Sequence, residues 1–300
     1  MSLVRRAHFD WHTRTRTLAL GQHTLVMGIL NVTPDSFSDG GHFYSPEHAP
    51  ERALAQAFRM IEEGAHILDI GGESTRPNAI PLTADEEQAR VLPVIEAILA
   101  QKPETILSID THHASTAVCA VDAGVEIVND VSGHLWDAAM TSNCAQLGCG
   151  TVLMHTRGRP EDWATQIPLA SDDILPLVLA GLRERIEAAT AAGIARNRIV
   201  LDPGFGFGKR LDENYPMLAH FDQLQQLNLP LLAGVSRKGF LAQALAPLYE
   251  ETLPPPEGRL HATTAANMAA ILNGAHIVRT HDVLPAVEAA AIADRILAAI

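Results

Sequence analysis

The chain has 300 residues, of which 47% are hydrophobic and 19% are charged, so it can form one large core or two modest ones. Its formal net charge is −13 and no basic block occurs, which argues against nucleic acid or an anionic membrane surface as a partner. No apolar run approaches the roughly 20 residues that a membrane span needs.

Cysteine usage and the N-terminus predict where the protein resides. Cys119, Cys144 and Cys149 are odd in number, and their spacing fits neither a zinc site nor a disulfide framework. We interpret all three as small core residues of a protein in a reducing compartment. Residues 1–10 lack the apolar stretch of a signal peptide. We therefore expect a cytoplasmic protein.

Residues 1–23 are predicted to form an N-terminal β-hairpin extension ahead of the main fold. Phe9 and Trp11 alternate with other residues, threonines follow at 13, 15 and 17, and residues 18–21 read Leu-Ala-Leu-Gly. A period of two is typical of strands. We expect this hairpin to cover one end of the main fold.

The first strand of the main fold leads into a polar loop. Residues 24–30 form a short, branched apolar run that is typical of a buried strand. Asn31 then places a side-chain amide at the strand's end, turn residues follow at 33–35, and Asp39 precedes two glycines. A polar, flexible loop at the C-terminal end of a buried strand is where α/β proteins place their chemistry.

Seven further strands are predicted, each ending in polar residues. They cover residues 66–70, 105–109, 125–128, 150–154, 198–201, 230–235 and 275–278. Helical segments rich in Ala and Leu, such as 171–192 and 260–273, lie between them. This alternation predicts an α/β protein, a (β/α)8 TIM barrel that forms a single domain over residues 1–300. A doubly wound sheet is the alternative, but it usually has fewer strands and one crevice.

A barrel brings the C-terminal ends of all its strands around one pocket. Polar side chains that follow distant strands then belong to one candidate site. Asp69 differs from the others because it lies within its strand pattern, where it can simply orient a neighbour. The candidates are Asn31, Asp69, Thr75, Arg76, Asp110, Asn129, His155, Asp202, Lys238, Arg279 and His281.

One subset of these residues suits a planar heterocycle that carries N–H groups. Such a ring needs paired donors and acceptors along one edge, which carboxylates, an amide and an ammonium provide. A lysine also keeps neighbouring carboxylates ionised. The subset consists of Asp110, Asn129, Asp202 and Lys238.

A second subset suits an anion. It consists of Asn31, Arg76, Arg279 and His281. Two guanidiniums and an imidazole at one rim are best suited to phosphate or diphosphate. The amide oxygen of Asn31 can ligate Mg²⁺, which commonly binds through one protein group together with phosphate oxygens.

Two other motifs are discounted as look-alikes. Residues 204–209 read Gly-Phe-Gly-Phe-Gly-Lys, but they lack the spacing of a Walker loop and the Ser or Thr after Lys209. We interpret them as a close-packed turn with Phe207 as an apolar wall. His112 and His113 have no metal-ligand partner at helical spacing, so no metal site is predicted there.

Seven motifs together resemble the dihydropteroate synthase family, in its order and over most of the chain. They are GILNVTPDSFSDGG at 28–41, GGESTRP at 71–77, SIDT at 108–111, ND at 129–130, LDPGFGFGK at 201–209, SRK at 236–238 and RTH at 279–281. The first two together are specific. The resemblance implies condensation of 6-hydroxymethyl-7,8-dihydropterin diphosphate with 4-aminobenzoate, which gives 7,8-dihydropteroate and diphosphate.

The resemblance also assigns residues to each substrate. The pterin ring is assigned to Asp110, Asn129, Asp202 and Lys238, with Met154 and Phe207 as apolar walls. The diphosphate is assigned to Asn31, Arg76, Arg279 and His281, with Mg²⁺ at Asn31. 4-Aminobenzoate is assigned to Phe37, Thr75, Pro77 and Ser236. The catalytic candidates are Asp35, Asp39, Arg76 and Lys238.

The implied reaction agrees with the chemistry of these side chains. Mg²⁺ and arginine neutralise the leaving diphosphate, and the dihydropterin delocalises the resulting cation, so we expect a dissociative path. Asp35 or Asp39 would stabilise that cation or orient the amine, and no covalent nucleophile is required. The resemblance further implies a homodimer and inhibition by sulfonamides, which imitate 4-aminobenzoate.

Two positions depart from the family pattern. Residues 154–158 read Met-His-Thr-Arg-Gly where a Met-Gln pair is common, which leaves Arg157 without an assigned role. Gly239 follows Ser-Arg-Lys where a Ser is frequent, so backbone N–H groups are left to receive the aminobenzoate carboxylate. The alternative functions are a pterin-dependent methyltransferase, which needs no diphosphate clamp, and a non-catalytic pterin-binding paralogue, which would usually have damaged loops.

Overall fold

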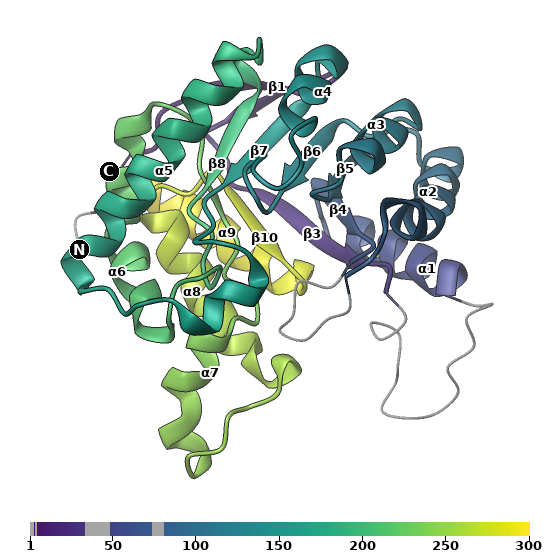
Figure 1. The fold of residues 1–300 in the computed structure, drawn as a ribbon. Helices are drawn as coiled ribbons and strands as arrows, with labels where there is room; N and C mark the ends of the chain where they lie inside the picture. The colour runs from purple at the N-terminus through teal and green to yellow at the C-terminus, as the bar shows by residue number, and fades with distance from the viewer. Residues whose placement is uncertain (1–2, 4, 34–48, 74–80) are drawn as a thin grey trace.

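The structure is a computed structural model that describes residue 3 and residues 5–33, 49–73 and 81–300. A two-stranded antiparallel hairpin, β1 (Phe9–His12) and β2 (Thr17–Leu20), precedes an eight-stranded parallel sheet with helices around it (Figure 1). Phe9 pairs with Leu20 and His12 with Thr17. The predicted N-terminal hairpin is confirmed.

Eight parallel strands close into a barrel. A parallel bridge between Leu201 and Leu231 joins the two edges of the sheet, and the Leu201 amide donates to the Pro230 carbonyl at 2.9 Å. The predicted TIM barrel is therefore confirmed. In spatial order the strands are β8 (Ile199–Asp202), β7 (Gly150–Met154), β6 (Ile127–Asp130), β5 (Ile106–Asp110), β4 (Ile67–Gly71), β3 (Leu25–Asn31), β10 (Ile277–Thr280) and β9 (Leu232–Ala233).

Helices cover the outside of the barrel, because each buries apolar side chains against the strands. The α-helices are α1 (Ala49–Glu62), α2 (Ala84–Gln101), α3 (Ala114–Asp122), α4 (Met140–Leu147), α5 (Ser171–Ala191), α6 (Asn214–Ala219), α7 (Gly239–Leu245), α8 (Leu260–Leu272) and α9 (Val283–Leu297). The 3-10 helices are η3 (Pro160–Thr165), η4 (Arg196–Arg198), η5 (Leu211–Glu213), η6 (Phe221–Leu227), η7 (Ala246–Tyr249) and η8 (Pro256–Arg259).

Most strands begin one or two residues later than predicted. Asp110, Asn129, Asp202 and Arg279 consequently lie within strands and not after them. The apolar runs correctly located the strands. Their C-terminal ends were missed because polar residues form the last pairings there, and a hydrophobic pattern does not detect polar strand residues. The predicted strand 230–235 was too long, since β9 has two residues.

The hairpin closes the N-terminal end of the barrel, as predicted. Trp11 and Leu20 are buried and pack in one apolar cluster with residues near the beginnings of the barrel strands. The Trp11 indole nitrogen also donates to the Arg198 carbonyl at 3.0 Å. The barrel residues of this cluster are Met27, Ile67, Ile127, Val152, Val200, Leu232 and Ile277.

The cysteines and the helix lengths bear on two further predictions. All three cysteines are free thiols, and Cys144 and Cys149 are buried. Cys119 is only partly buried, so the interpretation of all three as core residues is wrong for Cys119. Within the described ranges, no helix combines the length and the apolar character that crossing a membrane requires.

Trp11→Ala is expected to lower the free energy of unfolding by about 3–5 kcal/mol, the usual cost of removing a large aromatic side chain from a core. The change leaves a cavity under the barrel and removes the donor to the Arg198 carbonyl. Urea denaturation followed by circular dichroism measures the loss. Ile167→Ala is the control, since that side chain is 76% exposed. Equal losses in the two variants would contradict the conclusion that Trp11 helps the hairpin to close the N-terminal end of the barrel.

Candidate active site

Of the residues assigned to a substrate or to catalysis, ten lie in the described part of the chain, all at or just beyond the C-terminal ends of barrel strands. Those within strands are Asn31, Asp110, Asn129, Met154, Asp202 and Arg279, and those beyond them are Phe207, Ser236, Lys238 and His281. The other six, Asp35, Phe37, Asp39, Thr75, Arg76 and Pro77, lie outside the described residues.

Arg279 joins two carboxylates at the centre of this mouth. Its Nε donates to Asp69 Oδ2 at 2.6 Å, and its Nη2 donates to Asp110 Oδ2 at 2.5 Å. Asp69 Oδ2 also accepts from Asn129 Nδ2 at 2.9 Å. Side chains alone thus link β4, β5, β6 and β10. The two bonds of Arg279 use two of the five N–H donors of its guanidinium.

Burial and charge oppose one another at these groups. Burial by itself would lower the pKa of Arg279, but the Asp69 and Asp110 carboxylates raise it above the usual range of arginine. Burial raises the pKa of Asp110, while Arg279 acts against that rise and Asp69 adds to it. A fixed positive charge therefore lies between two carboxylates that water screens poorly.

The turn after β8 holds Asp202. Its Oδ1 accepts from the Gly204 amide at 2.7 Å. Gly204 has a φ of +70°, and an added Cβ would lie 2.0 Å from the His155 carbonyl oxygen, so the position requires glycine. Burial raises the pKa of Asp202, while the Gly204 amide and the Lys238 ammonium act in the opposite direction.

Lys209 fixes the same turn. Its buried Nζ donates to the carbonyls of His155, Gly204 and Phe207 at 3.1, 2.7 and 3.2 Å. These three acceptors match the three donors of an ammonium group. The interpretation of residues 204–209 as a close-packed turn is confirmed.

An apolar wall lines part of the mouth. Val131, Met154 and Phe207 form a separate buried cluster, and Trp136 and Trp163 pack against it. The Trp163 and Phe207 rings meet edge to face with centroids 5.2 Å apart. Met154 and Phe207 were predicted to be apolar walls, whereas sequence reasoning missed both tryptophans. The available signal was an aromatic residue in each of the segments that follow β6 and β7.

Lys238 lies between this wall and the carboxylates. Its Nζ is 4.0 Å from the centroid of the Phe207 ring. Burial lowers the pKa of Lys238 to about 8, and Arg279 acts in the same direction, whereas Asp202 and Asp110 oppose the change. The ammonium is therefore charged at neutral pH but close to its titration range.

Two motifs distant in the sequence are fastened together beside Lys238. Ser236 Oγ lies 3.0 Å from His281 Nδ1 and accepts from the His281 amide at 3.1 Å. Arg237 Nε and Nη2 donate to the two carboxylate oxygens of Asp282 at 3.0 and 2.7 Å. A side chain assigned to aminobenzoate and one assigned to diphosphate are thereby in direct contact.

Asn31 offers one oxygen atom that suits a magnesium ion. Its Oδ1 lies at the end of β3, and a Cβ added to Gly71 on the neighbouring strand would lie 3.7 Å from it. Mg²⁺ prefers hard oxygen ligands and usually retains several waters. The Asn31 amide oxygen is such a ligand, whereas Asp110 Oδ2 is already paired with Arg279.

Two residues singled out from the sequence stay out of this group. The His155 ring packs against α5, where a Cβ added to Gly181 would lie 2.6 Å from His155 Cδ2, and burial lowers the pKa of His155 to about 2. Arg157, which had no assigned role, anchors its own segment. Its Nη2 donates to the Ile167 carbonyl at 2.8 Å, and its Nη1 lies 3.8 Å from Glu213 Oε2.

The mouth can bind a flat polar ring next to an anion. Carboxyl oxygens of Asp110 and Asp202 can accept from N–H groups along a ring edge, and the Lys238 ammonium can donate to a ring acceptor. Phe207 offers an apolar face to the ring. The donors of Arg279 that its two carboxylates leave over suit phosphate oxygens.

Comparisons with known proteins agree with this chemistry. A family profile described as pterin binding enzyme matches residues 27–281. Dihydropteroate synthase of Bacillus subtilis (strain 168) is 43% identical over 272 residues, which cover 91% of this chain and 88% of that protein. A Yersinia pestis dihydropteroate synthase with a sulfonamide drug complex has a TM-score of 0.85 and 40% identity, covering 98% of this chain and 100% of that one. Xanthomonas albilineans dihydropteroate synthase with 4-aminobenzoic acid has a TM-score of 0.82 and 42% identity, covering 94% and 96%.

Gly204→Ala is expected to lower the free energy of unfolding by at least about 1 kcal/mol, since both the φ of +70° and the neighbouring carbonyl oxygen disfavour a Cβ. Gly239→Ala is the matched control. Its Cβ would meet Leu211 Cδ2 at 3.6 Å, an ordinary contact at the start of α7, so stability should be unchanged or slightly higher. Urea unfolding compares the two, and similar losses would show that the Asp202 turn has no special need for glycine.

Proposed function

The chain belongs to the dihydropteroate synthases of the pterin-binding enzyme family, and we propose that it condenses 6-hydroxymethyl-7,8-dihydropterin diphosphate with 4-aminobenzoate. The C–O bond between the pterin methylene carbon and diphosphate breaks, and a C–N bond to the aniline nitrogen forms. That nitrogen loses one proton. The products are 7,8-dihydropteroate and diphosphate, and the reaction belongs to folate biosynthesis.

The observation that carries the pterin assignment is the position of Asp110, Asn129 and Asp202 at the C-terminal ends of β5, β6 and β8, with Lys238 close by. We assign the ring edge to these four side chains. Asp202 is preorganised by the Gly204 amide, and Asn129 is held by Asp69. Met154 and Phe207 would contact the ring faces, because their cluster is apolar and lines the same mouth.

We assign the diphosphate to Asn31, Arg76, Arg279 and His281, of which Arg76 lies outside the described residues. Arg279 supports this role because its position is fixed by two carboxylates while other N–H donors of the guanidinium are left over. Asn31 would hold Mg²⁺, which when bound neutralises charge on the leaving diphosphate. Arg279, on the neighbouring strand β10, would share that task.

Cleavage by a dissociative path leaves a cation on the pterin methylene that the ring delocalises. Asp35 or Asp39 would stabilise this cation or orient the amine. 4-Aminobenzoate would lie near Phe37, Thr75, Pro77 and Ser236, of which Ser236 is described. Its hydroxyl is positioned by His281, which supports an aminobenzoate site adjoining the diphosphate site.

The proposal includes the domain organisation, the oligomeric state and the location of the protein. Residues 1–300 would act as one domain, and two copies would form a homodimer in the cytoplasm, as the family resemblance implies. A methyltransferase or a binding-only paralogue would use the pterin pocket without diphosphate release. The guanidinium of Arg279 favours the synthase, since a methyl donor brings no diphosphate to the pocket.

Diphosphate release is the direct test of this proposal. The purified chain is incubated with the dihydropterin diphosphate and Mg²⁺, with and without 4-aminobenzoate. We expect release in equal amounts with dihydropteroate, dependent on 4-aminobenzoate. Tight pterin binding without product at any aminobenzoate concentration would overturn the synthase assignment and favour the binding paralogue.

A conservative pair of variants locates the chemistry. Asp202→Asn should lower kcat/KM by about 10–100-fold, because one charged hydrogen-bond partner of the ring is lost. Asp173→Asn, a change on the exposed first turn of α5, should leave kcat/KM unchanged. A normal rate in Asp202→Asn would remove Asp202 from the pterin site.

The pH dependence reports on Lys238. Its pKa is lowered to about 8, so kcat/KM for the dihydropterin diphosphate should fall as pH rises through about 8, where the ammonium loses its proton. Lys238→Arg keeps a positive charge at every accessible pH and should abolish this alkaline decline, even with a lower maximum. The measurement is the pH profile of kcat/KM for the parent chain and for Lys238→Arg, at saturating 4-aminobenzoate and Mg²⁺. An unchanged decline in Lys238→Arg would assign it to another group.

A further inference from the structure

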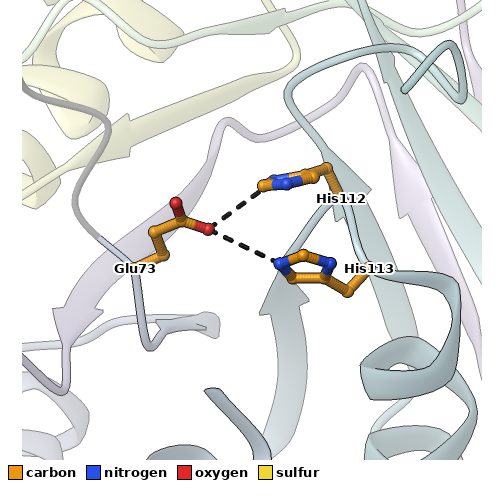
Figure 2. A group of neighbouring side chains, drawn as sticks. All are labelled: Glu73, His112 and His113. Carbon is orange, nitrogen blue, oxygen red and sulfur yellow. Dashed lines mark ion pairs between the residues drawn. The ribbon is translucent and has the colours of Figure 1, made fainter. Parts of the chain in front are cut away.

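Two adjacent histidines and a glutamate meet in a compact group at the edge of the mouth (Figure 2). Glu73 Oε2 lies 3.8 Å from His112 Nδ1 and 3.8 Å from His113 Nε2. One ligand atom from each residue lies within 4.8 Å of the other two. In the part of the chain that the structure describes, this is the only group of three or more His, Cys, Asp or Glu ligand atoms so close together.

The barrel register explains why these residues meet although they are distant in the sequence. β4 and β5 are neighbours, and Gly71 pairs with Asp110 at their C-terminal ends. Glu73 and His112 each follow two residues after that pair, and His113 is the N-cap residue of α3. The discounted His-His motif therefore has a possible third metal ligand in Glu73. It comes from the segment that follows β4 and not from a helical turn.

The facing atoms of the group are not hydrogen-bonded to one another, although the Glu73 carboxyl group also interacts with the Leu82 backbone. Glu73 Oε2 and His113 Nε2 are both buried atoms, and neither has a hydrogen-bond partner among the described residues. A separation of 3.8 Å is too long for a hydrogen bond. Two ligands about 2.0–2.1 Å from one tetrahedral zinc ion lie roughly 3.3–3.4 Å apart. Each of the two spacings to Glu73 Oε2 needs a contraction of about 0.5 Å, and the two imidazole nitrogens lie within 4.8 Å of each other.

We propose that Glu73, His112 and His113 bind one Zn²⁺ ion, with water as the fourth ligand. Two imidazole nitrogens and one carboxylate oxygen are ligands that zinc favours. Mg²⁺ prefers six oxygen ligands and is a poor match for imidazole. The site is therefore chemically distinct from the magnesium position assigned to Asn31.

The surroundings of the group suit a bound cation. The Trp136 ring meets the His112 ring edge to face with centroids 5.2 Å apart, which restricts the imidazole's orientation. The nearby Asp137 carboxylate accepts from the amides of Ala114 and Ala139, both at 2.9 Å, and so keeps a fixed negative charge next to the histidines. Two positive groups, Arg159 near His112 and Arg90 near Glu73, act against this negative charge and would weaken the binding of a cation.

The protonation states also agree with metal binding. Burial lowers the pKa of His112 to about 4, which leaves its imidazole neutral and able to ligate at neutral pH. Burial raises the pKa of Glu73, and a divalent cation would offset the cost of keeping that carboxylate ionised. A bound ion would connect the segment after β4 to the segment after β5 directly.

Direct titration with Zn²⁺ tests the site. The full chain, stripped of metal, is titrated against a chromophoric chelator with excess Mg²⁺ present, and Co²⁺ is used as a second probe for its four-coordinate absorption bands. We expect a single Zn²⁺ per chain. His112→Ala, His113→Ala and Glu73→Gln should each weaken Zn²⁺ binding by at least about 10–100-fold. That is the usual loss when a residue that only hydrogen-bonds to a metal ligand is changed, and these three residues would bind the ion directly.

Two controls make the result specific. His261→Ala removes an exposed histidine from α8 and should bind Zn²⁺ like the parent chain. Asn31→Ala should also retain the Zn²⁺ site, which separates it from the magnesium position. Circular dichroism without Zn²⁺ checks that each variant is folded. Unchanged Zn²⁺ affinity in folded His112→Ala and His113→Ala, or no Zn²⁺ binding by the parent chain, would overturn the proposal regardless of synthase activity.

Discussion

The charge of Arg279, whose side chain is 16% exposed, is the constraint on which the mouth of this barrel depends. The Asp69 side chain is fully buried and that of Asp110 is 15% exposed, so two such carboxylates alone would repel one another. The guanidinium between them cancels that repulsion, and its planar fork orients both at once. Removing one member would leave an uncompensated buried charge, which is strongly destabilising. Three strands thus have fixed relative positions before any substrate binds.

The same charge influences the groups around it. Arg279 contributes to the low pKa of Lys238, whereas Asp110 and Asp202 act against it. The lysine is consequently a group that titrates near physiological pH, although it remains mostly charged there. Arg279 itself cannot titrate in that range, since its carboxylates raise its pKa further. The mouth therefore combines one permanent cation, suited to an anionic leaving group, with one adjustable cation beside the apolar wall.

The sequence predicted the barrel and most of its polar rim because strand ends in a parallel barrel converge whatever lies between them. Its boundaries were displaced, since Asp110 and Arg279 pair as strand residues although they are polar. Contacts between distant segments could not be read from spacing. Glu73 meets His112 only because β4 neighbours β5, and Lys209 serves three backbone carbonyls that a linear motif does not display. The residue types at the strand ends were predictable from the sequence, whereas contacts between side chains of different strands were not.

The alternation of side chains along each strand connects the stability of the fold to the position of the site. Successive residues of a strand point to opposite faces, so residues two apart share a face. The apolar residues beneath the mouth precede its polar residues by two positions in four strands: Ile67 and Asp69, Ile127 and Asn129, Val200 and Asp202, Ile277 and Arg279. A slip of one residue would turn both members of a pair outward. The apolar layer that packs on Trp11 therefore fixes the register that aims the polar layer into the mouth, and the plug at one end of the barrel is a condition for the site at the other.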